Sequence, residues 1–354
     1  MRKNSPQYKE WKKRQDKKRS RHRQQRQDLK RNRNRIPVRP VAEDIRKEET
    51  YPKSEKKFSA PSVFSLQDNA AETTSFFNGI VRFIKDKHNY GKMIFFDISS
   101  VTKLTSDALM YLLAIITNLN HKLRKYRFSG NAPTDPSVQQ QFEESGFYKY
   151  VRRRGNRPLK ENKDILQIES GDTCSTMIAK QISDFVCEQA NLSSPRKCGF
   201  LYDISIELLS NTCKHAYGPN KNDFLRRWYY FVKRINQDTL SFVFLDTGEG
   251  IPATVQRNFA EKIDVLNIIG DSNYVISAFN GDFRTATQES YRGRGLPKLR
   301  SYCTSDTIQN FRIITNRADI KVLKSGYDEK NMPTSLCGTL YSWTINIPKL
   351  RGEM

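Results

Sequence analysis

The chain has 354 residues, of which 37% are hydrophobic and 28% are charged, and its formal net charge is +23 at pH 7. This length allows two domains of ordinary size and some additional chain. No apolar run reaches the roughly 18 residues needed to span a bilayer. No apolar core follows the basic N-terminus, which disfavours a secretory signal. We therefore expect a cytoplasmic protein without membrane insertion.

Positive charge is concentrated at the N-terminus. Residues 1–40 contain 17 lysines and arginines against three acids, a net charge of +14. Residues 1–57 lack hydrophobic periodicity, and so few apolar groups cannot offset chain entropy, which predicts a disordered basic tail. Because guanidinium groups bind phosphate and release counterions, residues 1–40 also predict nucleic acid binding. The alternatives are binding to an anionic membrane surface and a merely solvated tail.

Residues 58–151 predict a small α/β domain. Their apolar periodicity indicates helices at 71–86, 106–125 and 138–145, and a buried strand at 93–98. The stretch that follows, 152–170, begins with basic and polar residues punctuated by glycine and proline. We predict a linker there.

Residues 171–350 predict a second domain. The patterns indicate helices ending near Ala190 and His215, a helix beginning near Gly295, and strands at 223–235, 240–245, 311–315 and 341–347. This order predicts an α+β sandwich with one mixed sheet and helices on one face. The six cysteines form no C-x-x-C pair, so we expect buried, reduced thiols and no cysteine metal site.

The C-terminal half lacks a P-loop but contains four other short motifs in a fixed order. The first is Glu207–Asn211 (ELLSN) on a predicted helix. Residues at i and i+4 leave the same helix face. A carboxylate beside an amide oxygen suits a hydrated Mg²⁺ and a water that must be oriented. A solvated surface pair is the alternative for this motif alone.

The second motif, Asp246–Pro252 (DTGEGIP), follows an apolar strand. A carboxylate at a strand end can be partly buried and can accept from an exocyclic amine, and Gly248 and Gly250 permit close backbone approach. The third motif, Gly293–Leu296 (GRGL), precedes a helix and offers backbone N–H groups to phosphate. The fourth is Gly338–Thr339, at the start of the last predicted strand.

Together these motifs resemble those of the GHKL (gyrase, heat-shock chaperone, histidine kinase and MutL) ATPase superfamily, whose ATP-binding domain is the Bergerat fold. The resemblance covers about half of the chain, including the 35-residue spacing between Asn211 and Asp246. It implies that Glu207 orients the hydrolytic water or acceptor hydroxyl. It also implies that Asn211 ligates Mg²⁺, that Asp246 binds the adenine amine, and that Thr339 supports Asp246 through a water.

The same resemblance implies further ATP contacts within the two glycine motifs. The second of these motifs has no third glycine, and the intervening segment 253–291, where the superfamily has its ATP lid, has a sequence of its own. Arg294 and Lys298 are candidate phosphate contacts, with a solvated basic helix start as the alternative. The implied nucleotide-binding residues are Gly248, Gly250, Ile251, Gly293, Arg294, Gly295 and Leu296.

Within the superfamily the chain is most similar to the anti-sigma-factor serine kinases. No histidine lies in a phosphoacceptor motif, and residues 92–101 (KMIFFDISSV) and 105–109 (TSDAL) resemble a STAS domain, the partner fold of those kinases. Ser106 aligns with the serine that is phosphorylated in STAS domains. We favour the alternative that Ser106 caps a helix, with Asp107 in its first turn.

Three functions follow as hypotheses. The first is a Mg²⁺-dependent ATPase that acts as a nucleotide-driven conformational switch. The second is a serine/threonine kinase that acts on a STAS-like or other protein partner. The third is a nucleotide-sensing scaffold that binds nucleic acid through its tail. A nucleotide-dependent dimer is compatible with each of them.

Overall fold

The computed structural model describes residues 55–121, 127–151, 161–217, 225–283 and 295–353. The chain divides into two units, residues 1–51 and 52–354, and every described residue belongs to the second. The predicted disordered tail at 1–57 therefore lies outside the described residues, apart from 55–57, which form part of a strand.

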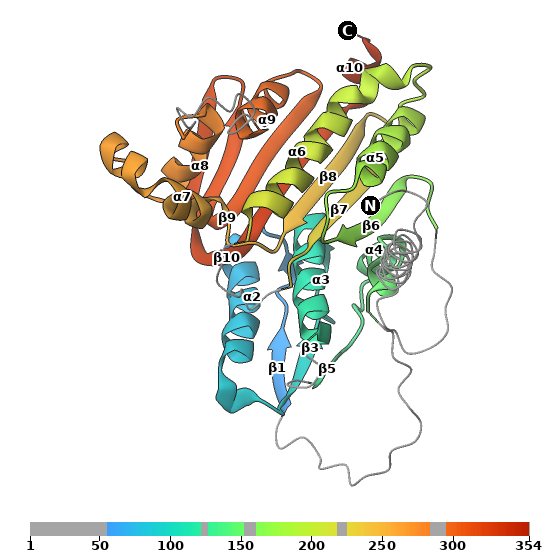
Figure 1. Cartoon of the computed structure of the whole chain (residues 1–354). Coiled ribbons are helices and arrows are strands. Elements are labelled where there is room, and N and C mark those ends of the chain that lie inside the picture. The colour runs from blue at the N-terminus through green and yellow to red at the C-terminus, as the bar shows by residue number, and fades with distance from the viewer. Residues whose placement is uncertain (1–54, 122–126, 152–160, 218–224, 284–294, 354) are drawn as a thin grey trace, which may run out of the picture. The chain divides into compact units, whose positions relative to one another are not determined.

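Residues 55–151 form an α/β arrangement (Figure 1). Its parallel three-stranded sheet has the order β1-β3-β5, and β2 and β4 form a separate short parallel pair. Most of α3 is buried, as expected of a helix that is apolar on all sides. The elements are β1 (Glu55–Ser59), β2 (Val63–Phe64), α2 (Ala70–Lys85), a 3-10 turn (Lys87–Asn89), β3 (Met93–Asp97), β4 (Lys103–Leu104), α3 (Ser106–His121), β5 (Arg127–Gly130), α4 (Pro136–Glu144) and a 3-10 turn (Phe147–Lys149).

The remaining described residues build a five-stranded sheet in the order β6-β7-β8-β10-β9, with antiparallel pairing between all neighbours. Helices α5, α6, α8 and α9 lie in front of this sheet in Figure 1. The elements are β6 (Ile165–Gly171), α5 (Thr176–Gln189), a 3-10 turn (Pro195–Cys198), α6 (Gly199–His215), β7 (Trp228–Asn236), β8 (Thr239–Asp246), α7 (Ile251–Leu266), α8 (Asp271–Asn280), α9 (Gly295–Cys303), β9 (Ile308–Leu323), β10 (Gly326–Asn346) and α10 (Ile347–Arg351).

The α+β class is confirmed, and the predicted helices correspond to α2, α3, α4, α5, α6 and α9. Parallel and antiparallel pairing both occur in the described residues, but in separate sheets, so the mixture expected within the C-terminal sheet is not seen there. Residues 165–170, where we predict a linker, belong to edge strand β6. Helices α7 and α8 were not predicted, and the predicted strands cover only short parts of β9 and β10.

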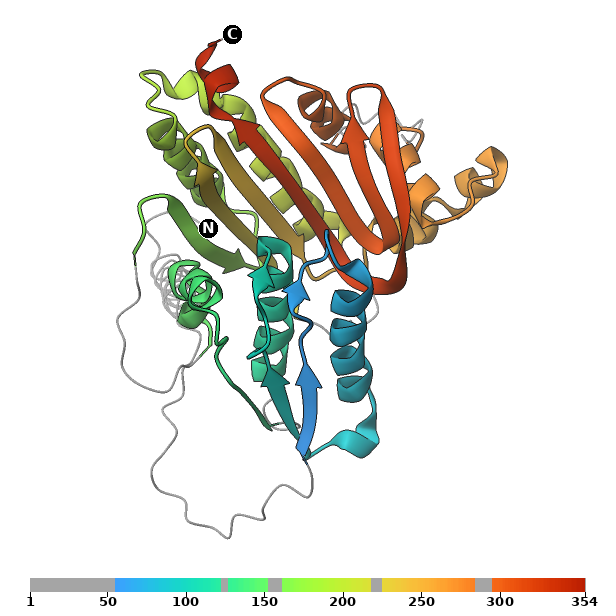
Figure 2. The same ribbon diagram turned by 180° about the vertical axis from the view of Figure 1, so that it is seen from behind.

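Both faces of the five-stranded sheet are covered near the end of β8, one by helices of the C-terminal part and the other by helices of the N-terminal part. Along a strand, side chains alternate between the two faces. One face of β7 and β8 packs with α5 and α6 through residues such as Trp228 and Phe244. The other packs with the N-terminal helices α2 and α3 through residues such as Tyr229 and Leu245. Figure 2 shows α2 and α3 from behind the sheet.

Candidate functional site

Helix α6 brings Glu207 and Asn211 to one half-buried face. Its apolar side, which includes Leu201, Ile204 and Leu208, packs into the core against the sheet. This packing fixes the rotation of the helix and leaves the i, i+4 pair half-buried at the edge of its apolar side. The Asn211 side-chain nitrogen Nδ2 is buried and has no hydrogen-bond partner among the described residues. A buried amide donor of this kind favours a polar ligand at the site.

Asp246 is the last residue of β8 and is only 4% exposed. Burial raises the pKa of its carboxyl from 3.8 to about 6, although hydrogen bonds from Gly248 and Thr339 partly oppose the increase. The Gly248 backbone N–H donates to Asp246 Oδ1 over 2.8 Å. At pH 7 and above, the site therefore holds a buried, mainly ionised carboxylate that can accept a further hydrogen bond.

The loop after Asp246 requires glycine at two positions. A Cβ atom at position 248 would lie 2.4 Å from the backbone carbonyl oxygen of Ala216. Gly250 has a φ of +90°, and a Cβ there would lie 2.3 Å from Asn316 Oδ1. The loop thus approaches its neighbours more closely than any residue with a side chain allows, and Ile251 then begins α7.

Gly295, the first residue of α9, lies against the Glu207 and Asn211 side chains. A Cβ atom built on Gly295 would lie 2.6 Å from Glu207 Oε2 and 3.3 Å from Asn211 Oδ1. The fold therefore brings the third sequence motif to the first, although 84 residues separate Asn211 from Gly295. Leu296 packs against the core of the C-terminal part, whereas Gly293 and Arg294 lie outside the described residues.

Thr339 joins the fourth motif to the second. It pairs with Asp246 in the antiparallel register of β10 and β8, and it is buried. The structure therefore gathers the described predicted residues, Leu296 apart, into two groups. Glu207, Asn211 and Gly295 form one group, and Asp246, Gly248, Gly250, Ile251 and Thr339 form the other.

Two residues that no sequence motif indicated hold the second group together. The Thr315 hydroxyl accepts from the Ile251 backbone N–H over 3.1 Å and donates to the Gly338 carbonyl over 3.0 Å. Asn316, whose φ is +49°, donates from Nδ2 to the Glu249 carbonyl over 3.0 Å. A threonine and an asparagine within a strand are too common to indicate this role, because the contacts that define it are not local.

Lys298 and the end of α6 each have a partner within the described residues. Lys298 Nζ lies 3.0 Å from Asp203 Oδ2 and forms an ion pair with it. The His215 carbonyl accepts from Arg257 Nη2 over 3.1 Å, and Arg257 also pairs with Glu249. Arg257 thus ties α7 to the end of α6.

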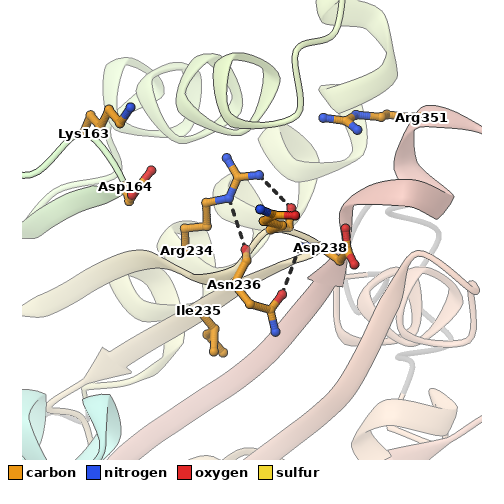
Figure 3. A pocket seen from close by; sticks show the side chains of 8 residues that line it. Lys163, Asp164, Arg234, Ile235, Asn236, Asp238 and Arg351 are labelled. Atoms are coloured by element: carbon orange, nitrogen blue, oxygen red, sulfur yellow. Dashed lines mark hydrogen bonds between the residues drawn. The ribbon is translucent and has the colours of Figure 1, made fainter.

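A polar cavity of about 580 Å³ lies at the other end of β7 and β8, by the turn that joins them (Figure 3). Its Arg234 guanidinium donates to the carbonyl oxygens of Asn236 over 3.1 Å and Gln237 over 2.6 Å. It also donates to the carbonyl and side-chain oxygens of Gln189. Because these bonds use most of its donors, Arg234 fastens the turn to α5 and is a poor candidate for ligand binding.

No protein-family model matches this chain, and a search of the curated proteins gives no match. Within the described residues, no group of three or more histidine, cysteine, aspartate or glutamate side chains could hold a metal ion. None of the helices in those residues is long and apolar enough to cross a membrane. Cys174 and Cys213 are exposed and Cys187, Cys198 and Cys303 are buried, so the expectation of buried thiols holds for only some of them.

Proposed function

We propose that the chain binds ATP and uses it as a Mg²⁺-dependent ATPase of the GHKL type. The observation that carries this proposal is that four separate segments form two groups, one where α6 meets the start of α9 and one where β8 meets β10. The buried Asp246 carboxylate, with Gly248 and Thr339 beside it, supplies an acceptor suited to the adenine amine. Glu207 and Asn211 lie beside Gly295 at the start of α9, where a helix N-terminus favours phosphate.

The residues present fit a magnesium ion as well as a nucleotide. Asn211 and Glu207 offer the hard oxygen atoms that Mg²⁺ prefers, and the side-chain nitrogen of Asn211, buried without a partner among the described residues, is a donor that suits a phosphate oxygen. Asn211 Oδ1 would hold the ion, which when bound supplies positive charge against the phosphates. Glu207 would orient the attacking water and accept its proton.

Within this proposal, the protein is a conformational switch that ATP drives. The N-terminal α/β part, which we propose to be STAS-like, packs directly on the sheet whose strand β8 ends at Asp246. A change at the nucleotide site can therefore reach that part through the strands of the five-stranded sheet on which it packs. Dimerisation upon nucleotide binding would be one output of such a switch.

The first alternative is a serine/threonine kinase of the anti-sigma-factor type. Ser106, the STAS-like candidate acceptor, is only 8% exposed at the start of α3, so a kinase would act on another protein in this conformation. The second alternative, a non-catalytic scaffold, is favoured by the charge of +14 in residues 1–40. In that case ATP would bind without turnover, and nucleic acid would bind through the tail.

Calorimetric titration of the full chain with MgATP and MgGTP tests the central proposal. The Asp246 carboxylate accepts from the amino group of adenine but faces the O6 acceptor of guanine. We expect ATP to bind about five- to 150-fold more tightly, because an unpaired buried acceptor costs about 1–3 kcal/mol. Equal affinities would reject the assignment of Asp246. Mass spectrometry of the same mixtures separates hydrolysis, phosphoryl transfer to protein, and binding alone.

A further inference from the structure

Helix α3 of the N-terminal part reaches the polypeptide next to the proposed adenine site. The Tyr111 hydroxyl accepts from the Cys337 backbone N–H over 3.0 Å and donates to the Cys337 carbonyl over 3.2 Å. One side chain thus binds both backbone groups of one residue. The ring is buried and packs against Phe77 of α2, with 4.7 Å between ring centroids, so the hydroxyl is held in a fixed position.

The residue that Tyr111 binds lies where the strand pairing of β10 is interrupted. The β10 register against β9 breaks between Leu336 and Thr339, and pairing with β8 begins only at Thr339. Cys337 falls inside this break, so Tyr111 supplies hydrogen bonds in place of the regular ladder. A buried backbone segment that lacks ladder bonds needs such partners to keep one position.

The next two residues of β10 contact Asp246. Gly338, with a φ of +89°, approaches so closely that a Cβ there would lie 2.0 Å from the Asp246 carbonyl oxygen. Thr339 follows and hydrogen-bonds to the Asp246 carboxyl. The path from Tyr111 to that carboxyl therefore runs through three consecutive residues of one strand.

A second contact from α3 reaches the other side of Asp246. Asn118 Oδ1 accepts from the Leu225 backbone N–H over 3.1 Å. The hydroxyl of Thr247, the residue after Asp246, donates to the Leu225 carbonyl. Helix α3 thus contacts the segments on both sides of the proposed adenine-binding carboxylate.

We propose that Tyr111 is a positioning residue for Asp246, and that α3 thereby couples the N-terminal part of the chain to nucleotide selectivity. The effect on the nucleotide rests on the proposed function, whereas the effect on Asp246 does not. Any event that displaces α3 from the sheet would release Cys337, Gly338 and Thr339 and lower the affinity for ATP. Conversely, ATP would strengthen the contact between α3 and the sheet, because such coupling is reciprocal.

Tyr111→Phe tests this inference because it removes only the hydroxyl and keeps the ring packing. The matched control is Asn78→Ala, which removes another hydrogen bond between the N-terminal part and β10, from Asn78 Nδ2 to Thr334 Oγ1 over 2.7 Å. We expect Tyr111→Phe to lower the ratio of ATP affinity to GTP affinity by about three- to tenfold, the range of one net hydrogen bond. Asn78→Ala should leave that ratio unchanged.

Hydrogen exchange without nucleotide tests the positioning itself. The Gly248 amide, which donates to Asp246 Oδ1, should exchange several-fold faster in Tyr111→Phe than in the wild type or in Asn78→Ala. Unchanged exchange at Gly248, or an equal increase in both variants, would overturn the inference. If exchange at Gly248 is faster in Tyr111→Phe alone, but the wild-type chain does not bind ATP, Tyr111 remains a positioning residue and the nucleotide site is rejected.

Discussion

Asp246 and Thr339 face each other across the antiparallel pair of β8 and β10, and both are buried. Thr339 hydrogen-bonds to the Asp246 carboxyl, yet burial still raises its pKa to about 6. The fold therefore maintains an ionised carboxylate at neutral pH in a place that disfavours its charge. Such a cost is expected at a binding site, where a ligand can supply the missing partner.

The pKa of Asp246 predicts the pH dependence of ATP binding. Only the ionised carboxylate is a pure acceptor for the adenine amine, so affinity should decline as the pH falls from about 7.5 through the pKa of about 6 to about 5. Asp246→Asn is the control because its side chain cannot titrate, and its weaker binding should change less over the same range. Calorimetry at a series of pH values measures both. Parallel pH profiles for the two proteins would show that another group is responsible.

The same pKa predicts that Asp246→Asn stabilises the nucleotide-free protein at neutral pH. The folded-state pKa of about 6 exceeds the reference value of 3.8, so this group favours folding below about pH 4 and loses that contribution as the pH rises through 6. Relative to wild type, the free energy of unfolding of the variant should therefore increase by up to about 3 kcal/mol as the pH rises from about 4 to about 8. Urea unfolding at both pH values measures the difference. A gain that does not depend on pH would show that the buried charge of Asp246 is not its cause.

Glu207 should separate turnover from binding. Glu207→Ala is expected to abolish ATP hydrolysis while ATP binding remains, because the proposed role of Glu207 concerns the attacking water and not the ground state. Asn211→Ala should instead remove the part of the affinity that depends on Mg²⁺. Phosphate release assays combined with calorimetry in the presence and absence of Mg²⁺ measure these effects. Full hydrolysis by Glu207→Ala would require a different base.

Gly248→Ala should destabilise the protein and weaken ATP binding. Its Cβ would lie 2.4 Å from a backbone oxygen and 2.6 Å from a side-chain atom of Ala216, so the chain must move, at a cost of about 1–3 kcal/mol. Gly199→Ala in α6 is the control, since its Cβ would meet nothing within 4 Å and alanine favours helix. Thermal unfolding compares the two variants. Similar melting temperatures for both would show that the close approach at Gly248 is relaxed in solution.

Residues 1–40 should bind DNA or RNA without sequence preference. Counterion release drives such contacts, so affinity should fall steeply between low and physiological salt. Removal of residues 1–40 should abolish this binding and leave ATP binding intact, because no proposed ATP contact lies there. Filter-binding titrations of both chains at several salt concentrations decide this. Equal retention of nucleic acid by the two chains would assign the binding to another surface.

The sequence by itself determined the features that depend on local order. Helix α6 ends where its pattern predicts, at His215, because its apolar residues recur at helical spacing. The same periodicity places Glu207 and Asn211 on one face. Asp246 is buried at a strand end because it follows the apolar run of β8, and that run is visible in the sequence.

Tertiary structure alone decided which of these segments meet. No local pattern in the sequence indicates that Gly295 lies against Glu207, that Thr315 joins α7 to β10, or that Tyr111 binds Cys337. The apolar residues on both sides of β7 and β8 indicate two buried faces, but they do not identify α3 as the cover. These contacts join residues that are far apart in the chain, and their partners are selected by the packing of whole layers, which no local pattern of residues records.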